Sequence, residues 1–144
     1  MSEVKMKHIV GVAAVVSVGN SYVLQHRKKA DASGYLVLPG GKLDEPDPVA
    51  GLLRELSEEI NLKAHLEQVK PLHIDNGTTR EGIPYLILYY HVHITQEQAQ
   101  TIENLEPDKC HNLMWTEFGV IHKARMWDND LRAIQAAYEN KRSR

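Results

Sequence analysis

Residues 40–62 read GGKLDEPDPVAGLLRELSEEINL and combine two glycines, an acidic loop and a helix-forming segment. A glycine turn leads into a helix in which Glu55, Glu58 and Glu59 stand at i, i+3 and i+4, so they share one face. Like charges at that spacing cost about 0.2–0.5 kcal/mol per pair, a repulsion that a hard divalent cation would remove. We therefore expect the chemistry of the protein to lie here.

The same helix has a marked start, a marked end and an apolar side. Asp47 can cap the helix, and Pro48 suits its first position. Gly51 lies on the acidic side, where the missing side chain would leave room for a metal ion or a phosphate. Asn61 can adopt the left-handed conformation that ends a helix. The apolar stripe, which must face a sheet, consists of Val49, Leu52, Leu53, Leu56 and Ile60.

The segment resembles the Nudix box, the signature of the Nudix hydrolases. That signature is Gly, five residues, Glu, seven residues, and then Arg-Glu-apolar-x-Glu-Glu-x-Gly-apolar. Residues 54–62 match it except at Asn61, where the family has Gly, and Leu-Pro-Gly-Gly at residues 38–41 precedes the box as in the family. The loop before Arg54 is one residue shorter than in the family and has Asp47 at the position of the first glutamate. Glu45 or Asp47 is expected to stand in for that glutamate.

The order of apolar and polar segments predicts a mixed sheet with a helix on either side, which is an α/β (α+β) chain with α/β/α layering. The resemblance implies the same sandwich, with the box loop and helix packed against the sheet, as a single Nudix hydrolase domain over residues 1–144. Polar loops are expected at residues 28–34, 76–82 and 103–111. Besides the box helix, strands are expected at residues 8–18, 22–27, 35–38, 62–75, 84–94 and 113–116, and helices at 96–102 and 126–140.

By the same resemblance, the acidic helix holds a catalytic metal. In the family, the residues that match Glu58 and Glu59 ligate a divalent cation, and the one that matches Glu55 is a metal ligand or the general base. Arg54 lies four residues before Glu58, and we assign it to orienting the acids. The expected catalytic residues are Glu55, Glu58, Glu59 and Arg54. The expected metal ligands are Glu55, Glu58, Glu59, Gly40 and Asp108, and the expected cofactor is Mg²⁺ or Mn²⁺.

The loop at residues 106–110, Glu-Pro-Asp-Lys-Cys, followed by Trp115, resembles a segment of Nudix enzymes that act on nucleoside triphosphates. In those relatives an acid of this loop adds a metal ligand or a base, a role that Asp108 or Glu106 could fill. The alternative is a polar loop capped by a core tryptophan. Cys110 has no activating neighbour in the sequence and is expected to be a small buried filler.

Further residues are candidates for substrate binding, each with a structural alternative. Asn76 and Tyr85 stand where such relatives place residues near the base, although a turn and a core tyrosine would look the same. Trp127 could cover the same cavity or belong to the core, and Arg27 could meet phosphates or be a solvated strand end. The expected substrate-binding set is Gly41, Arg27, Asn76, Tyr85, Glu106 and Trp127.

Composition narrows the class of protein further. The chain has 144 residues, of which 42% are hydrophobic and 25% charged, as in ordinary globular domains. Its net charge of −2 argues against a nucleic-acid or membrane surface, and its single cysteine excludes an internal disulfide and suits a reducing cytoplasm. The apolar run at residues 9–18, after Lys5 and Lys7, imitates a secretion signal, but its valines and the following Gly19-Asn20 turn favour a buried strand.

These observations predict an Mg²⁺-dependent enzyme that hydrolyses a nucleoside triphosphate, ordinary, oxidised or non-standard, to the monophosphate and pyrophosphate. Two alternatives stay open. One is a hydrolase of ADP-ribose, nucleotide sugars or dinucleoside polyphosphates, and the other is a Nudix domain that binds nucleotides without hydrolysing them. The expected partner is a nucleotide, with no membrane and no stable nucleic-acid partner. Family members are often dimers, so a homodimer is a candidate assembly.

Overall fold

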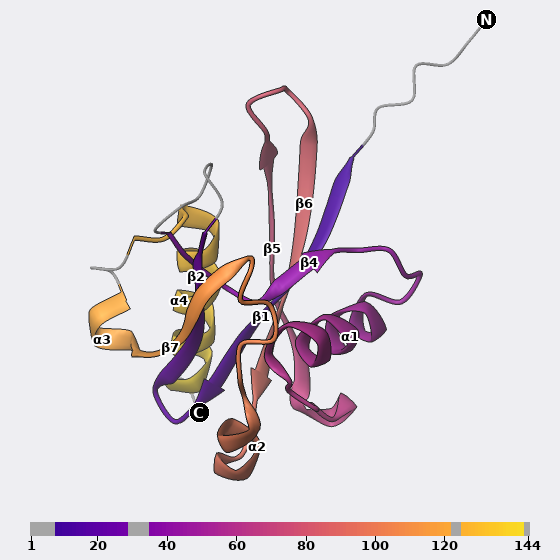
Figure 1. Cartoon of the computed structure of the whole chain (residues 1–144). Coiled ribbons are helices and arrows are strands. Elements are labelled where there is room, and N and C mark those ends of the chain that lie inside the picture. The colour runs from indigo at the N-terminus through magenta and orange to yellow at the C-terminus, as the bar shows by residue number, and fades with distance from the viewer. Residues whose placement is uncertain (1–7, 29–34, 122–124, 143–144) are drawn as a thin grey trace, which may run out of the picture.

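The computed structural model describes residues 8–28, 35–121 and 125–142, which form a mixed sheet between two helices (Figure 1). The strands are β1 (Ile9–Val18), β2 (Ser21–Arg27), β3 (Leu36–Val37), β4 (Gly40–Lys42), β5 (Val69–Thr78), β6 (Pro84–His93) and β7 (Cys110–Glu117). The helices are α1 (Pro48–Ile60), α2 (Gln96–Thr101), α3 (Phe118–Ile121) and α4 (Asp128–Arg142). None of the helices in these described ranges is long and apolar enough to cross a membrane.

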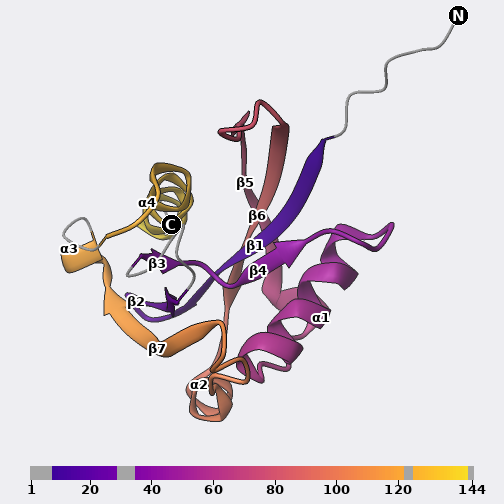
Figure 2. The ribbon, with the colours of Figure 1, turned by 45° about the horizontal axis from the view of Figure 1, so that its top comes forward.

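The strands pair in one sheet whose order is β3-β2-β1-β6-β5, with β4 paired to β1 and β7 paired to β2. β1 runs parallel to β6, with Ile9 opposite Tyr85 and Ser17 opposite His93. The remaining pairings between these strands are antiparallel, so the sheet is mixed. α1 and α4 lie on opposite sides of the strands (Figure 2). The expected fold class, an α/β/α sandwich with the box helix against a mixed sheet, is therefore confirmed.

Alternation of side chains along β1 divides the buried core into two halves. The half under α1 includes Val12, Ala14, Val16, Leu52, Leu56 and Ile60. The half under α4 includes Ala13, Val15, Leu38, Tyr89, Ala133 and Ile134. Because the apolar stripe of α1 is buried against the sheet, the rotation of this helix is fixed. Its acidic side then faces the neighbouring strands β2 and β4.

The termini of α1 agree with the expected signals. The Asp47 side chain accepts a hydrogen bond from the backbone N–H of Val49 at 3.0 Å, and Pro48 is the first helical residue. Asn61 ends the helix in the left-handed conformation, with φ of 57°. Gly51 differs from its expectation. A Cβ there would lie 3.0 Å from the side chain of Leu43, so the space beside Gly51 is filled by the box loop rather than left for a ligand.

Residues 40–42, which were expected to form only a turn, make strand β4, with Gly40 opposite Ala13 of β1. A side chain does not fit at Gly40, because a Cβ would lie 2.2 Å from the carbonyl oxygen of Val12. The strand expected from residue 62 begins instead at Val69, after a 3₁₀ turn at Leu66–Gln68. It continues to Thr78, because pairing with β6 extends to Thr78 opposite Pro84.

Near the C-terminus the expected elements shift by a few residues. β7 begins at Cys110, inside the expected loop, because it pairs with β2 as far as Arg27. The short helix α3 was not expected, and α4 begins at Asp128 rather than at residue 126. Met126 instead forms an isolated bridge with Leu36. Residues 29–34 of the expected loop, like Lys5 and Lys7, lie outside the described ranges.

Candidate active site

Glu59 is the most deeply buried acid of α1, with 7% of its surface exposed. Its Oε1 accepts a hydrogen bond from Nε2 of Gln25 on β2 at 3.3 Å. Its Oε2 is buried and has no hydrogen-bond partner among the described residues. Burial and the neighbouring Glu55 carboxylate raise the pKa of Glu59 well above its ordinary value. A buried carboxyl oxygen without a donor is costly, so this atom indicates a place for a positively charged ligand.

Glu55 lies one turn before Glu59, and β4 passes close to its carboxylate. A Cβ on Gly41 would lie 2.8 Å from both Cδ and Oε1 of Glu55, so glycine at this position leaves the carboxylate its space. Glu55 is also near enough to Glu59 to raise the pKa of Glu59, because two neighbouring carboxylates disfavour ionisation of each other. The unexpected strand β4 thus brings Gly41 to Glu55.

Arg54 gathers the remaining acids on the exposed side of the helix. Its guanidinium donates to both carboxylate oxygens of Glu45, at 2.7 and 2.9 Å, and also to Glu55 at 3.1 Å and Glu58 at 2.9 Å. The hydrogen bond to Glu45, together with the charges of Glu55 and Glu58, raises the pKa of Arg54, and the same bond lowers the pKa of Glu45. Glu58 is therefore turned toward Arg54, whereas Glu55 and Glu59 approach each other. Between Glu45 and Asp47, Glu45 is the residue that pairs with the box arginine.

The loop at residues 103–110 is tied to the end of α1. The backbone N–H of Glu103 donates to the carbonyl of Ile60, and that of Leu105 to the carbonyl of Glu59, both at 3.0 Å. Glu106 accepts a hydrogen bond from Lys109 at 3.3 Å, and its charge contributes to the raised pKa of Glu59. The loop therefore brings Glu106 to the paired acids. Asp108 is exposed in the same loop, and its charge acts on Lys109.

Arg27 ends β2 opposite Cys110, close to this loop. Its Nε is buried and has no hydrogen-bond partner among the described residues, so a cationic donor is available near Cys110, where the charge of Glu59 also acts. Cys110 is 5% exposed, and burial raises the pKa of its thiol. A buried thiol with a raised pKa is a poor nucleophile, in line with its expected role as a filler.

Asn76 and Tyr85, two of the expected substrate residues, lie on the paired strands β5 and β6. Asn76 is opposite Leu86 on β6, and Gly77, the next residue, is opposite Tyr85. Neighbouring strand residues face opposite sides of a sheet, so Asn76 and Tyr85 point away from each other. The Tyr85 ring covers Gly77, where a Cβ would lie 2.5 Å from the tyrosine oxygen. Trp127 is 40% exposed, and its ring centroid is 6.1 Å from that of Tyr35.

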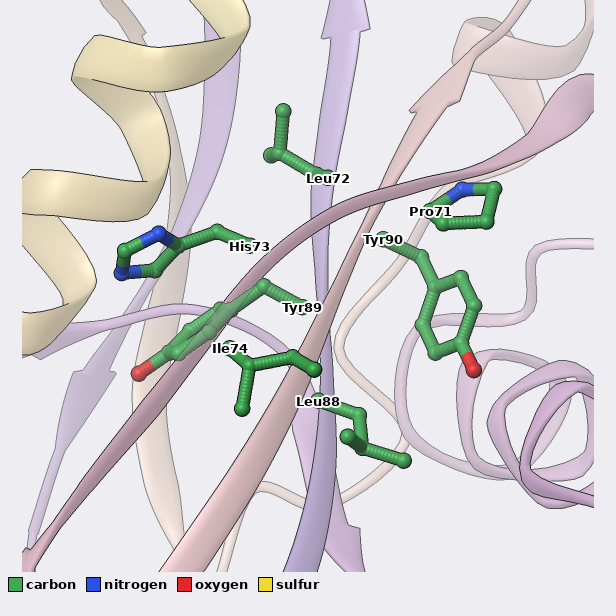
Figure 3. Close-up of a pocket in the computed structure, with 7 residues that line it drawn as sticks. All are labelled: Pro71, Leu72, His73, Ile74, Leu88, Tyr89 and Tyr90. Atoms are coloured by element: carbon green, nitrogen blue, oxygen red, sulfur yellow. The ribbon is translucent and has the colours of Figure 1, made fainter.

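A separate hollow of about 410 Å³ lies at the β5 edge of the sheet, lined by residues of β5 and β6 (Figure 3). It is formed beside an irregularity of β5 between Pro71 and His73. The side chains of His73 and Tyr89 lie on one side of these strands, and those of Leu88 and Tyr90 on the other (Figure 3). The hollow therefore wraps around a sheet edge, and it contains none of the box acids.

The site as described can accept a divalent cation, although not as a closed cage. Among the described residues there is no group of three or more His, Cys, Asp or Glu side chains placed to hold a metal ion. Glu55 and Glu59 do converge, and Oε2 of Glu59 lacks a partner within the described ranges. Mg²⁺ is commonly held by one or two carboxylates together with water and substrate phosphates. The two carboxylates fit that mode of binding.

Two contacts of this site were not expected from the sequence. Gln25 reaches Glu59 from β2, and Arg54 is held by Glu45 rather than by the acids of its helix alone. A signal for Gln25 existed, because it is a polar residue directly after the apolar run Tyr22–Leu24 and a polar residue in a buried strand needs a partner. Its particular partner depends on tertiary packing, which the run does not encode.

Comparison with known proteins identifies the family. A model of the NUDIX domain matches residues 7–137. The MutT NUDIX hydrolase from Burkholderia pseudomallei has a similar fold, with a TM-score of 0.75 and 22% identity over 90% of this chain and 98% of that chain. The E. coli ORF135 protein gives a TM-score of 0.74 and 24% identity over 96% of this chain and 94% of that chain.

A third similar structure is a bifunctional NMN adenylyltransferase/ADP ribose pyrophosphatase from Francisella tularensis, complexed with AMP and a Mn ion. It gives a TM-score of 0.75 and 20% identity over 94% of this chain and 42% of that chain. At identities of 20–24% these structures show the fold alone. The family is shown by the domain match, which covers most of the chain. The protein therefore belongs to the Nudix hydrolase family, and the family and enzyme class expected from the box are confirmed.

Proposed function

We propose that the protein hydrolyses a nucleoside triphosphate to the monophosphate and pyrophosphate, with Mg²⁺ or Mn²⁺ as cofactor. The observation that carries this proposal is the pair of carboxylates on α1. Glu59 is buried, with Oε2 unpartnered among the described residues, and the nearby Glu55 carboxylate raises its pKa. The arrangement is costly without a bound cation and favourable with one.

Each described residue of the site has a separate task in this proposal. Glu55 and Glu59 would hold the cation together with the main chain at Gly40, and Asp108 or Glu106 is a candidate for a further ligand. When bound, the cation neutralises the polyphosphate charge and lowers the pKa of a coordinated water. Glu55 is also the candidate base that accepts a proton from the attacking water.

The two arginines of the site orient the acids and offer a donor to the phosphates. Arg54 binds Glu45, Glu58 and Glu55 and so orients these acids. The buried Nε of Arg27 is a candidate donor for a phosphate oxygen. Gly41 permits close approach because it has no side chain. Glu58 would join the metal site only after leaving Arg54.

The triphosphate is the preferred substrate because the loop that carries Glu106 and Lys109 is anchored beside Glu59 and adds both signs of charge there. Asn76, Tyr85 and Trp127 are proposed contacts for the nucleoside. A second candidate is ADP-ribose or another nucleoside diphosphate derivative. The similarity to a chain described as an ADP ribose pyrophosphatase favours including it.

A panel of nucleotides tests this proposal. Nucleoside triphosphates, oxidised triphosphates, ADP-ribose, nucleotide sugars and dinucleoside polyphosphates are incubated with Mg²⁺, with Mn²⁺ and with EDTA, and products are separated by chromatography. We expect release of pyrophosphate from a triphosphate, dependent on the metal and lost in Glu59→Gln. Monophosphate products from ADP-ribose alone would favour the second candidate. Ligand-induced thermal stabilisation without any turnover would identify a binding domain instead.

The remaining properties follow the same proposal. We propose that residues 1–144 act as one Nudix domain in the cytoplasm, on a small nucleotide substrate and without a nucleic-acid partner. The buried Cys110 is compatible with a reducing compartment. A homodimer is proposed because members of the family are often dimers. Sedimentation of the purified chain measures its oligomeric state.

A further inference from the structure

Gln25 is a polar residue in the most buried part of β2. Residues 22–24 before it are 0–1% exposed, and Gln25 itself is 3% exposed. Polar side chains in protein interiors are generally retained with hydrogen bonds. The backbone of Gln25 is held from two sides, because it lies opposite Val37 of β3 and opposite Leu113 of β7. The sheet therefore fixes the point from which this amide reaches α1.

The amide of Gln25 is directed at one oxygen of one acid. Its Nε2 donates to Oε1 of Glu59 at 3.3 Å, although the two residues are 34 positions apart in the chain. The other oxygen of that carboxylate, Oε2, is buried and has no partner among the described residues. A donor on Oε1 restricts rotation of the carboxylate, so Oε2 is the oxygen that stays without a donor and can accept a ligand.

We propose that Gln25 is a positioning residue of the metal site, whose amide holds one oxygen of Glu59 so that the other faces the cation. This inference rests on the proposed function, because it requires Glu59 to be a metal ligand. Other residue types would serve less well at this place. An apolar side chain would leave both oxygens of a buried carboxylate without a donor, and a glutamate would add a further negative charge beside Glu55 and Glu59.

The expected effect is on metal affinity. Outer-shell partners that orient a ligating carboxylate typically change metal affinity or activity by about 10- to 100-fold when they are removed. The 3.3 Å hydrogen bond is long, so we expect a loss near the lower end of that range. Because Gln25 does not touch the substrate in this proposal, a high metal concentration should restore the catalytic rate.

Two substitutions separate the amide from the volume of the side chain. Gln25→Leu keeps a side chain of similar size and removes the donor. Gln25→Asn keeps the amide and withdraws it by one carbon–carbon bond, about 1.5 Å, which places Glu59 out of reach. Gln68→Leu is the matched control, because the Gln68 amide donates to Gln98 and to the carbonyl of His93, contacts that involve none of the site acids.

The test measures Mn²⁺ binding to the free protein by the loss of the EPR signal of unbound Mn²⁺, together with thermal unfolding and kcat at rising Mn²⁺. We expect both Gln25 variants to bind Mn²⁺ about tenfold more weakly than the wild type. Their kcat should recover at saturating Mn²⁺, and Gln68→Leu should bind as the wild type does. If Gln25→Leu fails to fold, the Asn variant decides.

The outcomes keep this inference separate from the proposed function. Normal Mn²⁺ affinity in a folded Gln25 variant, with affinity lost in Glu59→Gln, refutes the role of Gln25 and leaves the metal site intact. Normal affinity in Glu59→Gln, or no Mn²⁺ binding by the wild type, refutes the proposed function. A loss of affinity in Gln68→Leu equal to that in the Gln25 variants also overturns the inference, because it would show a general effect of removing a glutamine amide.

Discussion

Arg54 binds Glu45 through two hydrogen bonds, from Nε to Oε2 at 2.7 Å and from Nη2 to Oε1 at 2.9 Å. This fork-to-fork geometry is the most specific pairing that arginine and a carboxylate can make. Asp47, the other acid expected to replace the first glutamate of the box, caps α1 instead. The shortened box loop therefore retains a partner for the box arginine, and that partner is Glu45.

We expect Glu45→Ala to impair the metal site more than Asp47→Ala does. Without Glu45, the guanidinium of Arg54 is free to pair more closely with Glu55, which competes with cation binding. Asp47→Ala removes a helix cap and should cost about 1 kcal/mol of stability while leaving the acids in place. Mn²⁺ affinity and urea unfolding of both variants make the comparison. Weaker binding in the Asp47 variant than in the Glu45 variant would contradict the assignment.

Two adjacent glycines should respond differently to the same substitution. In Gly40→Ala the new Cβ would lie 2.2 Å from a backbone oxygen of β1, which cannot move easily. We expect a loss of stability of about 1–3 kcal/mol or more. In Gly41→Ala the Cβ meets only the carboxylate end of Glu55, which can rotate away. That variant should fold, and displacement of Glu55 by about 1 Å should lower activity by about 10²-fold.

Thermal unfolding and pyrophosphate release, measured on both glycine variants, test this contrast. The control is Gly19→Ala, at a turn glycine with no atom near a built Cβ, which should lose some stability through its positive φ of 57° but keep its activity per folded molecule. Full activity in Gly41→Ala would show that Glu55 need not stay where β4 leaves it room.

Glu59→Gln should uncouple the protein from its cation. For the wild type, a metal present at 100 times its dissociation constant adds about 2.7 kcal/mol to the free energy of unfolding. The glutamine variant should lose most of that increment and several orders of magnitude of hydrolysis. Without metal it should be at least as stable as the wild type, since a neutral amide replaces a buried acid beside Glu55. Unfolding curves with Mg²⁺ and with EDTA provide the measurement.

The sequence could predict those features that depend on local signals. The cap at Asp47, the end at Asn61 and the apolar stripe define α1 within one stretch, so the helix and its acidic side were predicted together. β4 was not predicted, because two glycines and a lysine carry no strand pattern and its partner β1 lies far away in the chain. The approach of Gln25 to Glu59 was not predicted either, since it depends on how β2 packs against α1.

Side-chain choices within the box also escape the sequence. The spacing of Glu55, Glu58 and Glu59 predicts one shared face, but the structure separates Glu58, which pairs with Arg54 at 2.9 Å. Glu58 is at i+4 from Arg54 and at i+3 from Glu55. The helical spacing therefore allows Glu58 to approach either residue. Which of them is adopted depends on the charges of the surrounding loop and on the bound ligand.

On the other side of the sheet, Asp130 of α4 is a buried acid of a different kind, 6% exposed. Its Oδ1 accepts a hydrogen bond from the Tyr89 hydroxyl at 2.7 Å, and its Oδ2 accepts one from the backbone N–H of Leu38 at 3.2 Å. These contacts tie α4 to the segment that enters β4. Burial nevertheless raises the pKa of Asp130 above its ordinary value.

A raised folded-state pKa means that the folded protein binds the Asp130 proton more tightly than the unfolded chain does. The resulting stability is fully present below the unfolded pKa of about 4 and is lost as pH rises through the folded pKa.

Asp130→Asn cannot titrate, so its free energy of unfolding relative to the wild type should improve with rising pH, by up to about 1.4 kcal/mol per unit of pKa shift. A constant loss should be superimposed, because asparagine offers one acceptor oxygen where the Tyr89 hydroxyl and the Leu38 N–H now donate to two. Urea unfolding of both proteins between about pH 4 and pH 7 measures this difference, in which other titrating groups cancel. A difference that stays flat across the range would mean that Asp130 is charged at the same pH in both states, and that the Leu38 and Tyr89 donors fully compensate its burial.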